Sequence, residues 1–361
     1  MELSIIGLAR GGKTTVFKAL TGGRAEATAS ARTAVGVVKV PDQRVDELVS
    51  MFRPRKVVPA EVRFVDMGPA PSDLGKGQGL AGPLAAVLSK ADAFIHVVRA
   101  FDEPSVPHPL STLDPDRDVA TFDLEMAFAD LIILERRLDR LTASLRAARA
   151  MEKDALLREQ KLLAKIKAAL ETEVPLRAQT FDPEEVKSLS NFQFLTSKPL
   201  LLLFNLGEEK AGQADALEAA WRQRHQRPAG AVATLFGKVE DELTQMTPQE
   251  AAEFRTALGL PAAGAAEVTR LAYQLLGLLT FYTVGEDEVR AWPVPQGTTA
   301  VKAAGRIHSD LEKGFIRAEV VSYVDLMACG SLAEARRRGQ LRAEGREYRI
   351  QDGDIVTILF H

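Results

Sequence analysis

Cysteine is almost absent from this 361-residue sequence, which has a single one, Cys329. One thiol can form neither an internal disulfide nor a cysteine-based zinc site. Disulfide scaffolds are therefore excluded, and a reducing, cytoplasmic environment is expected. The chain has to be stabilised by buried cores instead, and its length allows about two to three domains.

Long hydrophobic runs are also missing. No stretch approaches the roughly 18 consecutive apolar residues that a membrane-spanning helix requires. The amino terminus begins Met1-Glu2, and the apolar run at residues 3–7 is too short for the core of a signal peptide. We therefore expect neither an export signal nor a membrane partner.

The sequence has little excess charge of either sign. Its 46 basic and 49 acidic residues give a net charge of -3, with a pI near 6.1. Bulk charge therefore gives no general attraction to nucleic acid, and any RNA contact has to come from a local basic patch.

A phosphate-binding motif follows the first apolar run. Residues 7–14 read GLARGGKT, which fits G-x-x-x-x-G-K-[ST], and a helical pattern follows at residues 15–20. Glycines let backbone N–H groups turn toward phosphates, and the N-terminus of the next helix adds positive charge. Lys13 is expected to reach the β- and γ-phosphates, and Thr14 to bind Mg²⁺. The expected nucleotide-binding residues of this segment are Leu8, Ala9, Arg10, Gly11, Gly12, Lys13, Thr14 and Thr15.

Four segments predict parallel strands. Residues 3–6, 62–65, 93–98 and 199–204 are almost wholly apolar, as strands buried on both faces of a sheet are. Helical segments separate them, which predicts a doubly wound, mostly parallel α/β domain with its ligand at the carboxyl ends of the strands. Asp66 ends the second strand, where P-loop proteins hold Mg²⁺, although a turn aspartate without a ligand would look the same.

Between the third and fourth strands, residues 123–170 read as long helix. Leucines recur at three- and four-residue spacing and then at sevens, with charged residues on the other faces, which predicts an antiparallel helical hairpin or short coiled coil. A solvated helix face and a contact with ribosomal RNA or another polyanion both explain a basic cluster near its tip. This cluster consists of Arg136, Arg137, Arg140, Arg146 and Arg149.

The carboxyl-terminal part has a different pattern. Residues 280–283, 289–292 and 355–360 predict strands, and residues 301–308 predict a helix. A small, mixed, β-rich domain is expected. Its acidic and basic residues roughly balance, so charge alone does not indicate RNA binding.

Several segments together carry a family resemblance. They read VVKVPDQR at residues 37–44, KGQGL at 76–80, HVVRAF at 96–101, DPDRD at 114–118, VRAW at 289–292, IHSDLEKGFIRAEV at 307–320 and QDGD at 351–354. On these segments the chain resembles the YchF-type Obg-like ATPases over nearly its whole length, as a divergent member.

The resemblance implies a P-loop nucleotide-binding domain at residues 1–122 and 196–278, interrupted by a helical hairpin at 123–195 and followed by a TGS-like domain at 279–361. It also implies an enzyme that uses Mg²⁺, binds and hydrolyses ATP in preference to GTP, and associates with ribosomes. The hairpin and the TGS-like domain are the candidate contacts with the ribosome or its RNA, and a cytoplasmic monomer is expected.

The resemblance further implies how the base is chosen. Guanine-specific relatives use N-K-x-D, whose aspartate accepts hydrogen bonds from guanine, whereas adenine presents an acceptor at N1 and a donor at N6. Residues 205–208 read NLGE, like the family's N-x-x-E. Asn205 is then expected to bond the adenine edge, Leu206 to lie near the ring and Glu208 to take the acidic position. A polar cap after a strand is the alternative.

Three departures from the family pattern concern the phosphates. Arg10 stands where the family has an asparagine associated with K⁺, and arginine cannot coordinate a cation, so we expect potassium stimulation to be lost. Pro69 replaces the glycine whose N–H senses the γ-phosphate, and proline has no N–H to donate. The first switch is shortened, and Ser30 falls nearest to the threonine that helps to bind Mg²⁺.

The resemblance also implies a catalytic histidine. Residues 101–108 read FDEPSVPH, which matches the spacing of the family's mobile loop and puts His108 where a neutral imidazole positions the attacking water. Without the resemblance, His108 would be an ordinary loop histidine. His96 lies inside an apolar strand and is expected to be a packed core residue.

Two classes of function remain open from the sequence. Lys13, Thr14 and His108 favour a slow ATPase that signals through its nucleotide state. The altered phosphate loop and switches favour a nucleotide-binding scaffold that has largely lost hydrolysis. A GTPase is a third possibility, which Glu208 opposes.

Overall fold

The chain forms two compact units. The computed structural model describes residues 1–361 except 25, 28–32, 69–79, 81–82 and 261–263. The first unit consists of residues Met1–Gly36 and Arg63–Val268, and the second of Val37–Val62 and Thr269–His361. Residues 37–62, which the sequence placed in the nucleotide-binding domain, therefore group with the carboxyl-terminal part.

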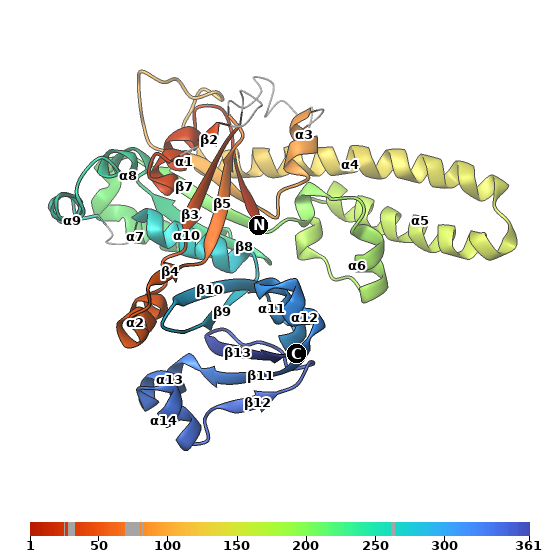
Figure 1. Cartoon of the computed structure of the whole chain (residues 1–361). Helices are drawn as coiled ribbons and strands as arrows, with labels where there is room; N and C mark the ends of the chain where they lie inside the picture. Colours follow the sequence, from red (N-terminus) through yellow and green to blue (C-terminus); the bar gives the residue numbers. More distant parts are fainter. Residues whose placement is uncertain (25, 28–32, 69–79, 81–82, 261–263) are drawn as a thin grey trace. The chain divides into compact units, whose positions relative to one another are not determined.

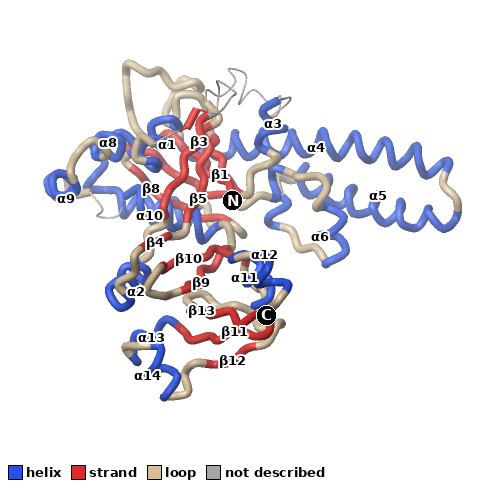
Figure 2. Tube along the Cα trace, in the orientation of Figure 1, coloured by secondary structure: helices blue, strands red, loops and turns tan. Residues whose placement is uncertain are grey.

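A mostly parallel sheet forms the centre of the first unit (Figure 2). Its order among the described residues is β2-β3-β5-β1-β6-β7-β8. The strands are β1 (Glu2–Ile6), β2 (Glu26–Ala27), β3 (Ala34–Lys39), β5 (Glu61–Asp66), β6 (Ala93–Ala100), β7 (Leu200–Leu206) and β8 (Gly230–Leu235). β1 pairs in parallel with β5 and β6, and β7 with β6 and β8. Every residue of β6 and β7 is buried, which explains their apolar sequences, and the predicted α/β P-loop architecture is confirmed.

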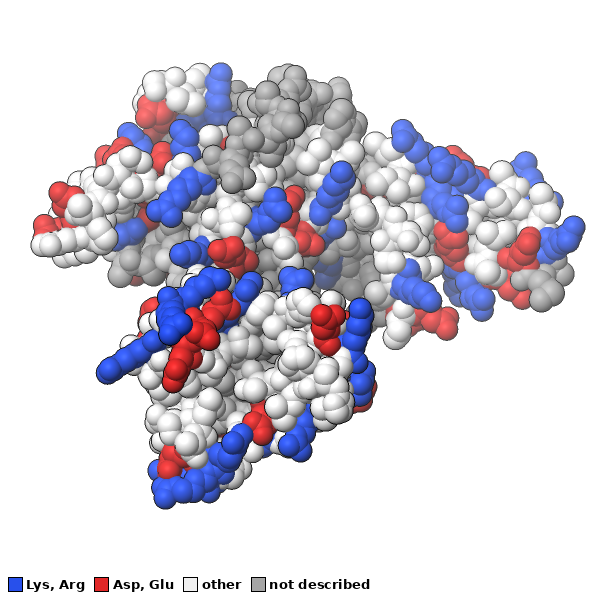
Figure 3. Space-filling view, in the orientation of Figure 1, with Lys and Arg blue, Asp and Glu red and all other residues white. Residues whose placement is uncertain are grey.

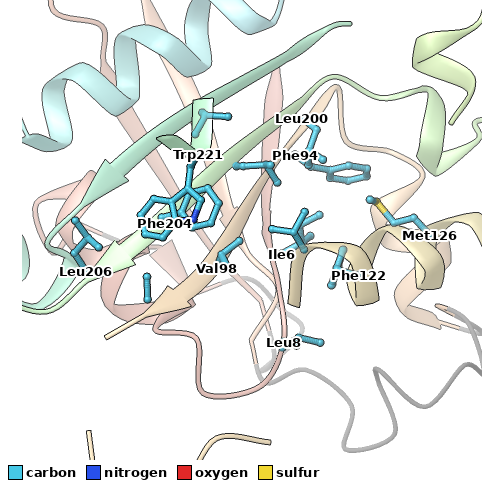
Figure 4. Close-up of a cluster of buried hydrophobic side chains, with 14 of the residues drawn as sticks. Ile6, Leu8, Phe94, Val98, Phe122, Met126, Leu200, Phe204, Leu206 and Trp221 are labelled. Carbon is cyan, nitrogen blue, oxygen red and sulfur yellow. The ribbon is translucent and has the colours of Figure 1, made fainter. Parts of the chain in front are cut away.

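Helices pack against this sheet. They are α1 (Lys13–Thr21), α3 (Pro83–Leu88), α7 (Ala214–Arg224), α8 (Gly237–Leu243) and α9 (Pro248–Ala257), with the short 3-10 helix η3 (Glu208–Gln213). Helix α10 (Gly264–Leu275) begins in the first unit, and its residues from Thr269 onward belong to the second. The rings of Phe204 and Trp221 stack with their centroids 4.0 Å apart (Figure 4). This packing holds β7 firmly in place, so the polar residue near its end, Asn205, has a fixed position.

A helical hairpin lies between β6 and β7 (Figure 1). The antiparallel helices α4 (Pro115–Ala147) and α5 (Ala150–Glu171) are followed by η1 (Leu176–Ala178), α6 (Pro183–Leu189) and η2 (Leu195–Ser197). Arg137 joins the two long helices, because its Nε and Nη2 donate to the Glu159 carboxylate at 2.7 and 2.8 Å. The predicted hairpin is confirmed, and its buried leucines include Leu134, Leu141, Leu163 and Leu170.

The first helix of the hairpin begins at Pro115, earlier than the leucine spacing suggested. The cause is a local start signal: the Asp114 side chain accepts a hydrogen bond from the Arg117 N–H, and proline fits the first helical position. Although α4 has 33 residues, it carries charged side chains throughout. None of the helices in the described part of the chain is both long and apolar enough to cross a membrane.

The second unit contains a mixed sheet with the order β12-β11-β13-β9-β10-β4 among its described strands. They are β4 (Lys56–Val58), β9 (Leu278–Thr283), β10 (Glu288–Pro295), β11 (Phe315–Ser322), β12 (Arg342–Glu344) and β13 (Asp354–Phe360). Its helices are α2 (Gln43–Phe52), α11 (Ala300–Ile307), α12 (Ser309–Lys313), α13 (Tyr323–Cys329) and α14 (Leu332–Arg337). The sequence predicted the β-rich character of this part, but not that α2 and β4 belong to it.

Candidate nucleotide-binding site

The loop between β1 and α1 depends on two glycines. Gly7 and Gly12 have φ angles of 141° and 86°. A Cβ atom on Gly7 would lie 2.4 Å from the carbonyl oxygen of Val97, and one on Gly12 would lie 2.3 Å from Nδ2 of Asn205. No other residue fits at either position, so the loop lies directly against β6 and β7.

Lys13 is buried inside this loop. Its ammonium group donates hydrogen bonds to the carbonyl oxygens of Gly7 at 3.1 Å and Leu8 at 2.8 Å. Burial lowers the pKa of Lys13 to about 8, an effect that the negative charge of Asp66 partly offsets. A lysine held in this way is poorly solvated and favours the charged oxygens of a phosphate as partners. The Leu8 side chain lies in the core, so it is the backbone of this residue that faces the lysine.

Thr14 and Asp66 meet beside Lys13. The Thr14 hydroxyl donates to a carboxylate oxygen of Asp66 at 2.8 Å, and the other oxygen accepts from the Gly68 N–H at 3.0 Å. Among the described residues there is no group of three or more His, Cys, Asp or Glu side chains that could hold a metal. One hydroxyl and one carboxylate suit Mg²⁺, which keeps several waters and takes phosphate oxygens as further ligands. Zn²⁺, which prefers four protein ligands or three and a water, does not fit.

Arg10 contacts the loop that precedes α4. Its Nη1 donates to the carbonyl oxygen of Pro107 at 3.0 Å, so the tip of the phosphate loop reaches the residue next to His108. Arg99 holds the same loop from inside, because its Nη1 and Nε donate to the carbonyl oxygens of Val106 at 2.8 Å and Phe101 at 3.2 Å. Sequence reasoning missed Arg99, although an arginine within an otherwise apolar strand was a usable signal.

The side chain of His108 is buried between this loop and α4. Its Nε2 lies 2.8 Å from a carboxylate oxygen of Asp118, and its Nδ1 accepts a hydrogen bond from the Leu110 N–H at 3.1 Å. The second oxygen of Asp118 accepts from the Arg117 guanidinium group at 2.8 and 3.2 Å. The structure thus brings His108 close to the phosphate loop through Pro107, and both ring nitrogens are engaged.

Asn205 joins the phosphate loop to α8. Its Nδ2 donates to the carbonyl oxygen of Gly11 at 3.2 Å, and its Oδ1 accepts from the Gly237 N–H at 3.0 Å. These bonds hold the two loops together at the end of β7. The proposed bond of Asn205 to the adenine edge would have to use the remaining hydrogen-bonding capacity of this amide, and it stays a prediction.

The other residues expected near the base differ in exposure. Leu206 is 2% exposed and packs in the core of the first unit, whereas Glu208 is exposed at the start of η3. Contact of either residue with an adenine ring stays a prediction, and little of Leu206 is accessible for one. Ser30 and Pro69 lie outside the described residues.

His96 is part of the core, as predicted. It is fully buried in β6, and its ring centroid lies 4.5 Å from that of Phe122. Neither ring nitrogen has a hydrogen-bond partner among the described residues. Burial lowers the pKa of His96 to about 3, so the ring is neutral.

Known proteins resemble the chain along its whole length. The family model for the YchF-GTPase carboxyl-terminal domain, described as a protein of unknown function (DUF933), matches residues 278–361. The "Ribosome-binding ATPase YchF" of Bacillus subtilis (strain 168) is 37% identical over all of this chain and 99% of its own length. The protein of the same name from Escherichia coli O157:H7 is 34% identical with the same coverage. The solved structure of the Schizosaccharomyces pombe YchF GTPase superposes with a TM-score of 0.85 at 29% identity, covering 99% of this chain and 97% of that one.

Proposed function

Because the chain belongs to the YchF family, we propose that it binds ATP with Mg²⁺ and hydrolyses it slowly, as a ribosome-associated nucleotide switch. The observation that carries the proposal is the meeting of Lys13, Thr14 and Asp66 at the phosphate loop. An ammonium group, a hydroxyl and a carboxylate in this arrangement are what P-loop proteins use for phosphates and Mg²⁺.

Each residue of the phosphate loop has a distinct part in this proposal. Lys13 exchanges the carbonyl oxygens of Gly7 and Leu8 for oxygens of the β- and γ-phosphates, which are stronger acceptors because they are charged. Thr14 and Asp66 would hold Mg²⁺, which supplies positive charge against the phosphates. His108 positions the attacking water after it gives up one of its present bonds.

ATP is the proposed nucleotide because Glu208 stands where guanine-specific relatives have aspartate. Two of the similar proteins are named ATPases, which supports this choice. The Schizosaccharomyces pombe protein is called a GTPase, so GTP is the competing substrate. Asn205 and Glu208 are the residues expected to decide between them.

A scaffold with little hydrolysis is the second candidate function. Two observations favour it: Arg10 bonds the Pro107 carbonyl oxygen, and both nitrogens of His108 have partners. In addition, Pro69 cannot donate a backbone hydrogen bond to a γ-phosphate. A protein that keeps these contacts with ATP bound would bind the nucleotide without cleaving it.

The ribosome contact is proposed for the tip of the helical hairpin. Lys and Arg side chains gather along the hairpin in the space-filling view (Figure 3). Glu159 pairs with Arg137, whereas no ion pair within the described part of the chain neutralises Arg136, Arg140 or Arg146. These three charges are therefore available for phosphate groups. The carboxyl-terminal unit is proposed as a second contact, and the protein as a cytoplasmic monomer.

The test combines binding and turnover. Calorimetry would compare the affinities for ATP and GTP, and phosphate release would be measured for wild type and His108→Ala, with and without potassium and ribosomes. We expect ATP selectivity, no potassium effect, and turnover that falls on removal of His108. His225→Ala is the matched control, since His225 also bonds an aspartate, Asp116 of α4. ATP binding without turnover under every condition would favour the scaffold, and GTP selectivity would overturn the ATP assignment.

A further inference from the structure

The two hydrogen bonds of His108 define which ring nitrogen carries the proton. Asp118 is 3% exposed in its side chain, and one of its oxygens accepts from the Arg117 guanidinium group. An ionised carboxylate in this setting can only accept, so the Nε2 of His108 must donate to it. The Leu110 N–H can only donate, so Nδ1 must be the unprotonated nitrogen. Both bonds therefore require the same neutral form, with the proton on Nε2.

The loop that carries His108 is held against the nucleotide site. Arg10 of the phosphate loop bonds Pro107, the residue immediately before His108. The carbonyl oxygens of Val106 and Phe101 are bonded to Arg99, which projects from the end of β6. Asp118 lies on the first turns of α4, a long helix with its own capped start. The histidine is thus placed by a rigid helix on one side and by the phosphate loop on the other.

We propose that Asp118 is the positioning residue of the hydrolytic reaction: it fixes His108 with the proton on Nε2, so that Nδ1 is the nitrogen that receives the water proton. This inference rests on the proposed ATP hydrolysis. The Leu110 N–H occupies the Nδ1 lone pair in the structure described, so this bond has to be exchanged for one from the attacking water. The Asp118 bond stays in place throughout.

The bonds and protons of the step then balance. The water oxygen forms a bond to the γ-phosphorus while the bond from that phosphorus to the β–γ bridging oxygen breaks, and ADP leaves. One water proton passes to Nδ1, which gives an imidazolium ring with Nε2–H still bonded to the Asp118 carboxylate. The proton returns from Nδ1 to the released phosphate, which restores the neutral ring. Arg117 keeps the carboxylate oriented during these changes.

Asp118→Asn tests this role without changing the size of the side chain. The Arg117 guanidinium group requires an oxygen facing it, so the new amide turns its NH₂ group toward Nε2 of His108. That nitrogen then has to accept, and the ring proton moves to Nδ1, the nitrogen that is needed as a base. We expect kcat for ATP to fall by about 10²-fold or more, with KM little changed. ATP turnover with saturating Mg²⁺ gives both constants.

Nitrogen-15 NMR of histidine-labelled protein supplies a measurement that is independent of activity. Two-bond correlations from ring carbon-bound protons distinguish a proton on Nε2 from one on Nδ1. We expect His108, assigned by its loss in His108→Ala, to have the proton on Nε2 in wild type and on Nδ1 in Asp118→Asn. The chain has five histidines, so the spectrum is simple.

Asp116→Asn is the matched control, because Asp116 lies two residues earlier on α4 and bonds a different histidine, His225. It should leave kcat and the His108 signals unchanged. If His108→Ala abolishes turnover but Asp118→Asn retains kcat and a proton on Nε2, the positioning role is wrong and the proposed function stands. A proton on Nδ1 in wild type would also overturn it. If wild type has no turnover at all, the proposed hydrolysis fails together with the role of Nδ1, and the NMR result still reports the pairing itself.

Discussion

Charged side chains have different kinds of hydrogen-bond partner in the phosphate loop and in a polar cluster around helix α2. This α2 cluster consists of Asp42, Arg44, Glu47, Tyr282, Tyr323 and Asp352. In the second unit, Arg44 bonds Asp42 at 2.9 Å and Asp352 at 2.6 Å, and its guanidinium group lies 5.3 Å from the ring centre of Tyr282. Tyr282 also donates to Asp42, and Tyr323 donates to Glu47. Each charged group in this α2 cluster has at least one partner among the other polar side chains, so none depends on a ligand to satisfy it.

The phosphate loop is different, because its charged groups bond backbone atoms that they can leave. Lys13 is bonded to two carbonyl oxygens, and Arg10 to a third. On the neighbouring loop, the Nδ1 atom of His108 accepts a hydrogen bond from the backbone N–H of Leu110. Groups with charge and only neutral partners gain most from a charged ligand. The contrast teaches that a site for a ligand is recognised by polar groups with replaceable partners, and a structural network by groups that satisfy one another.

The largest expected effect comes from removing the charge of the phosphate loop. Lys13→Ala should weaken ATP binding by about 10²-fold, because a hydrogen bond between charged groups is worth ~1.5–3 kcal/mol and Lys13 makes more than one. Calorimetry gives the dissociation constant. Lys18→Ala is the control, since Lys18 is exposed on the same helix α1. Equal ATP affinity for wild type and Lys13→Ala would remove the basis for a nucleotide site here.

The second effect tests the α2 cluster. Arg44→Met should destabilise the second unit by about 2 kcal/mol, because Asp42 and Asp352 lose their shared partner in a half-buried site. The two tryptophans lie one in each unit, so urea unfolding followed by Trp292 fluorescence in a Trp221→Phe background reports the second unit separately.

Arg55→Met is the control for this measurement. Arg55 forms a fully solvated pair with Asp287 in the same unit, at 3.4 Å and with both side chains at least 86% exposed. Its loss should change stability by less than about 0.5 kcal/mol. Equal losses for the two variants would show that the α2 cluster is no stronger than a surface ion pair.

The third effect is a rise in folding stability with pH that comes from the phosphate loop. The pKa of Lys13 is lowered to about 8 from an ordinary 10.5, so between these values the folded protein holds fewer protons than the unfolded chain. Stability therefore rises with pH through this window. Wild type should gain roughly 1–2 kcal/mol over Lys13→Met between pH 7 and pH 10, measured by urea unfolding without nucleotide. If the difference in free energy of unfolding between the two proteins did not change with pH, Lys13 would not be desolvated.

The smallest effect is expected in the helical hairpin, outside both regions. Arg137→Met removes a bond to Glu159 from a side chain that is 38% exposed, so solvent screens the pair. We expect a loss of about 0.5 kcal/mol in thermal or urea unfolding. If Arg137→Met lowered the free energy of unfolding by more than Arg44→Met does, the Arg137–Glu159 pair would be the stronger of the two networks.

The sequence predicted most of the first unit, because local patterns determine it. Almost wholly apolar runs predicted the central parallel strands, and the G-x-x-x-x-G-K-T motif predicted the phosphate loop. Strand β8 (Gly230–Leu235) was missed, because its short Gly- and Ala-containing sequence lacks a contiguous run of large apolar residues. The early start of α4 was missed although its Asp114-Pro115 signal was present.

What could not be predicted depends on contacts between distant parts of the chain. VVKVPDQR and QDGD were both noted as family segments, but nothing local shows that Arg44 of the first bonds Asp352 of the second, 308 residues away. The same limit applies to Asn205, whose partners Gly11 and Gly237 become neighbours through strand order. The sequence was enough to assign residues to the site, but their hydrogen-bond partners could be identified only from the three-dimensional structure.

The assignment of α2 to the second unit has a consequence for folding while the chain is being synthesised. Val45 and Leu48 are the buried residues of this helix, and Asp352, which holds it through Arg44, is made 308 residues later than that arginine. At synthesis rates of ~5–20 residues per second, the delay is roughly 15–60 s. The apolar face of α2 is made at the start of that interval, whereas strand β9 begins only at Leu278 and strand β13 only at Asp354. An early segment of the chain therefore reaches its final surroundings only when synthesis is nearly finished.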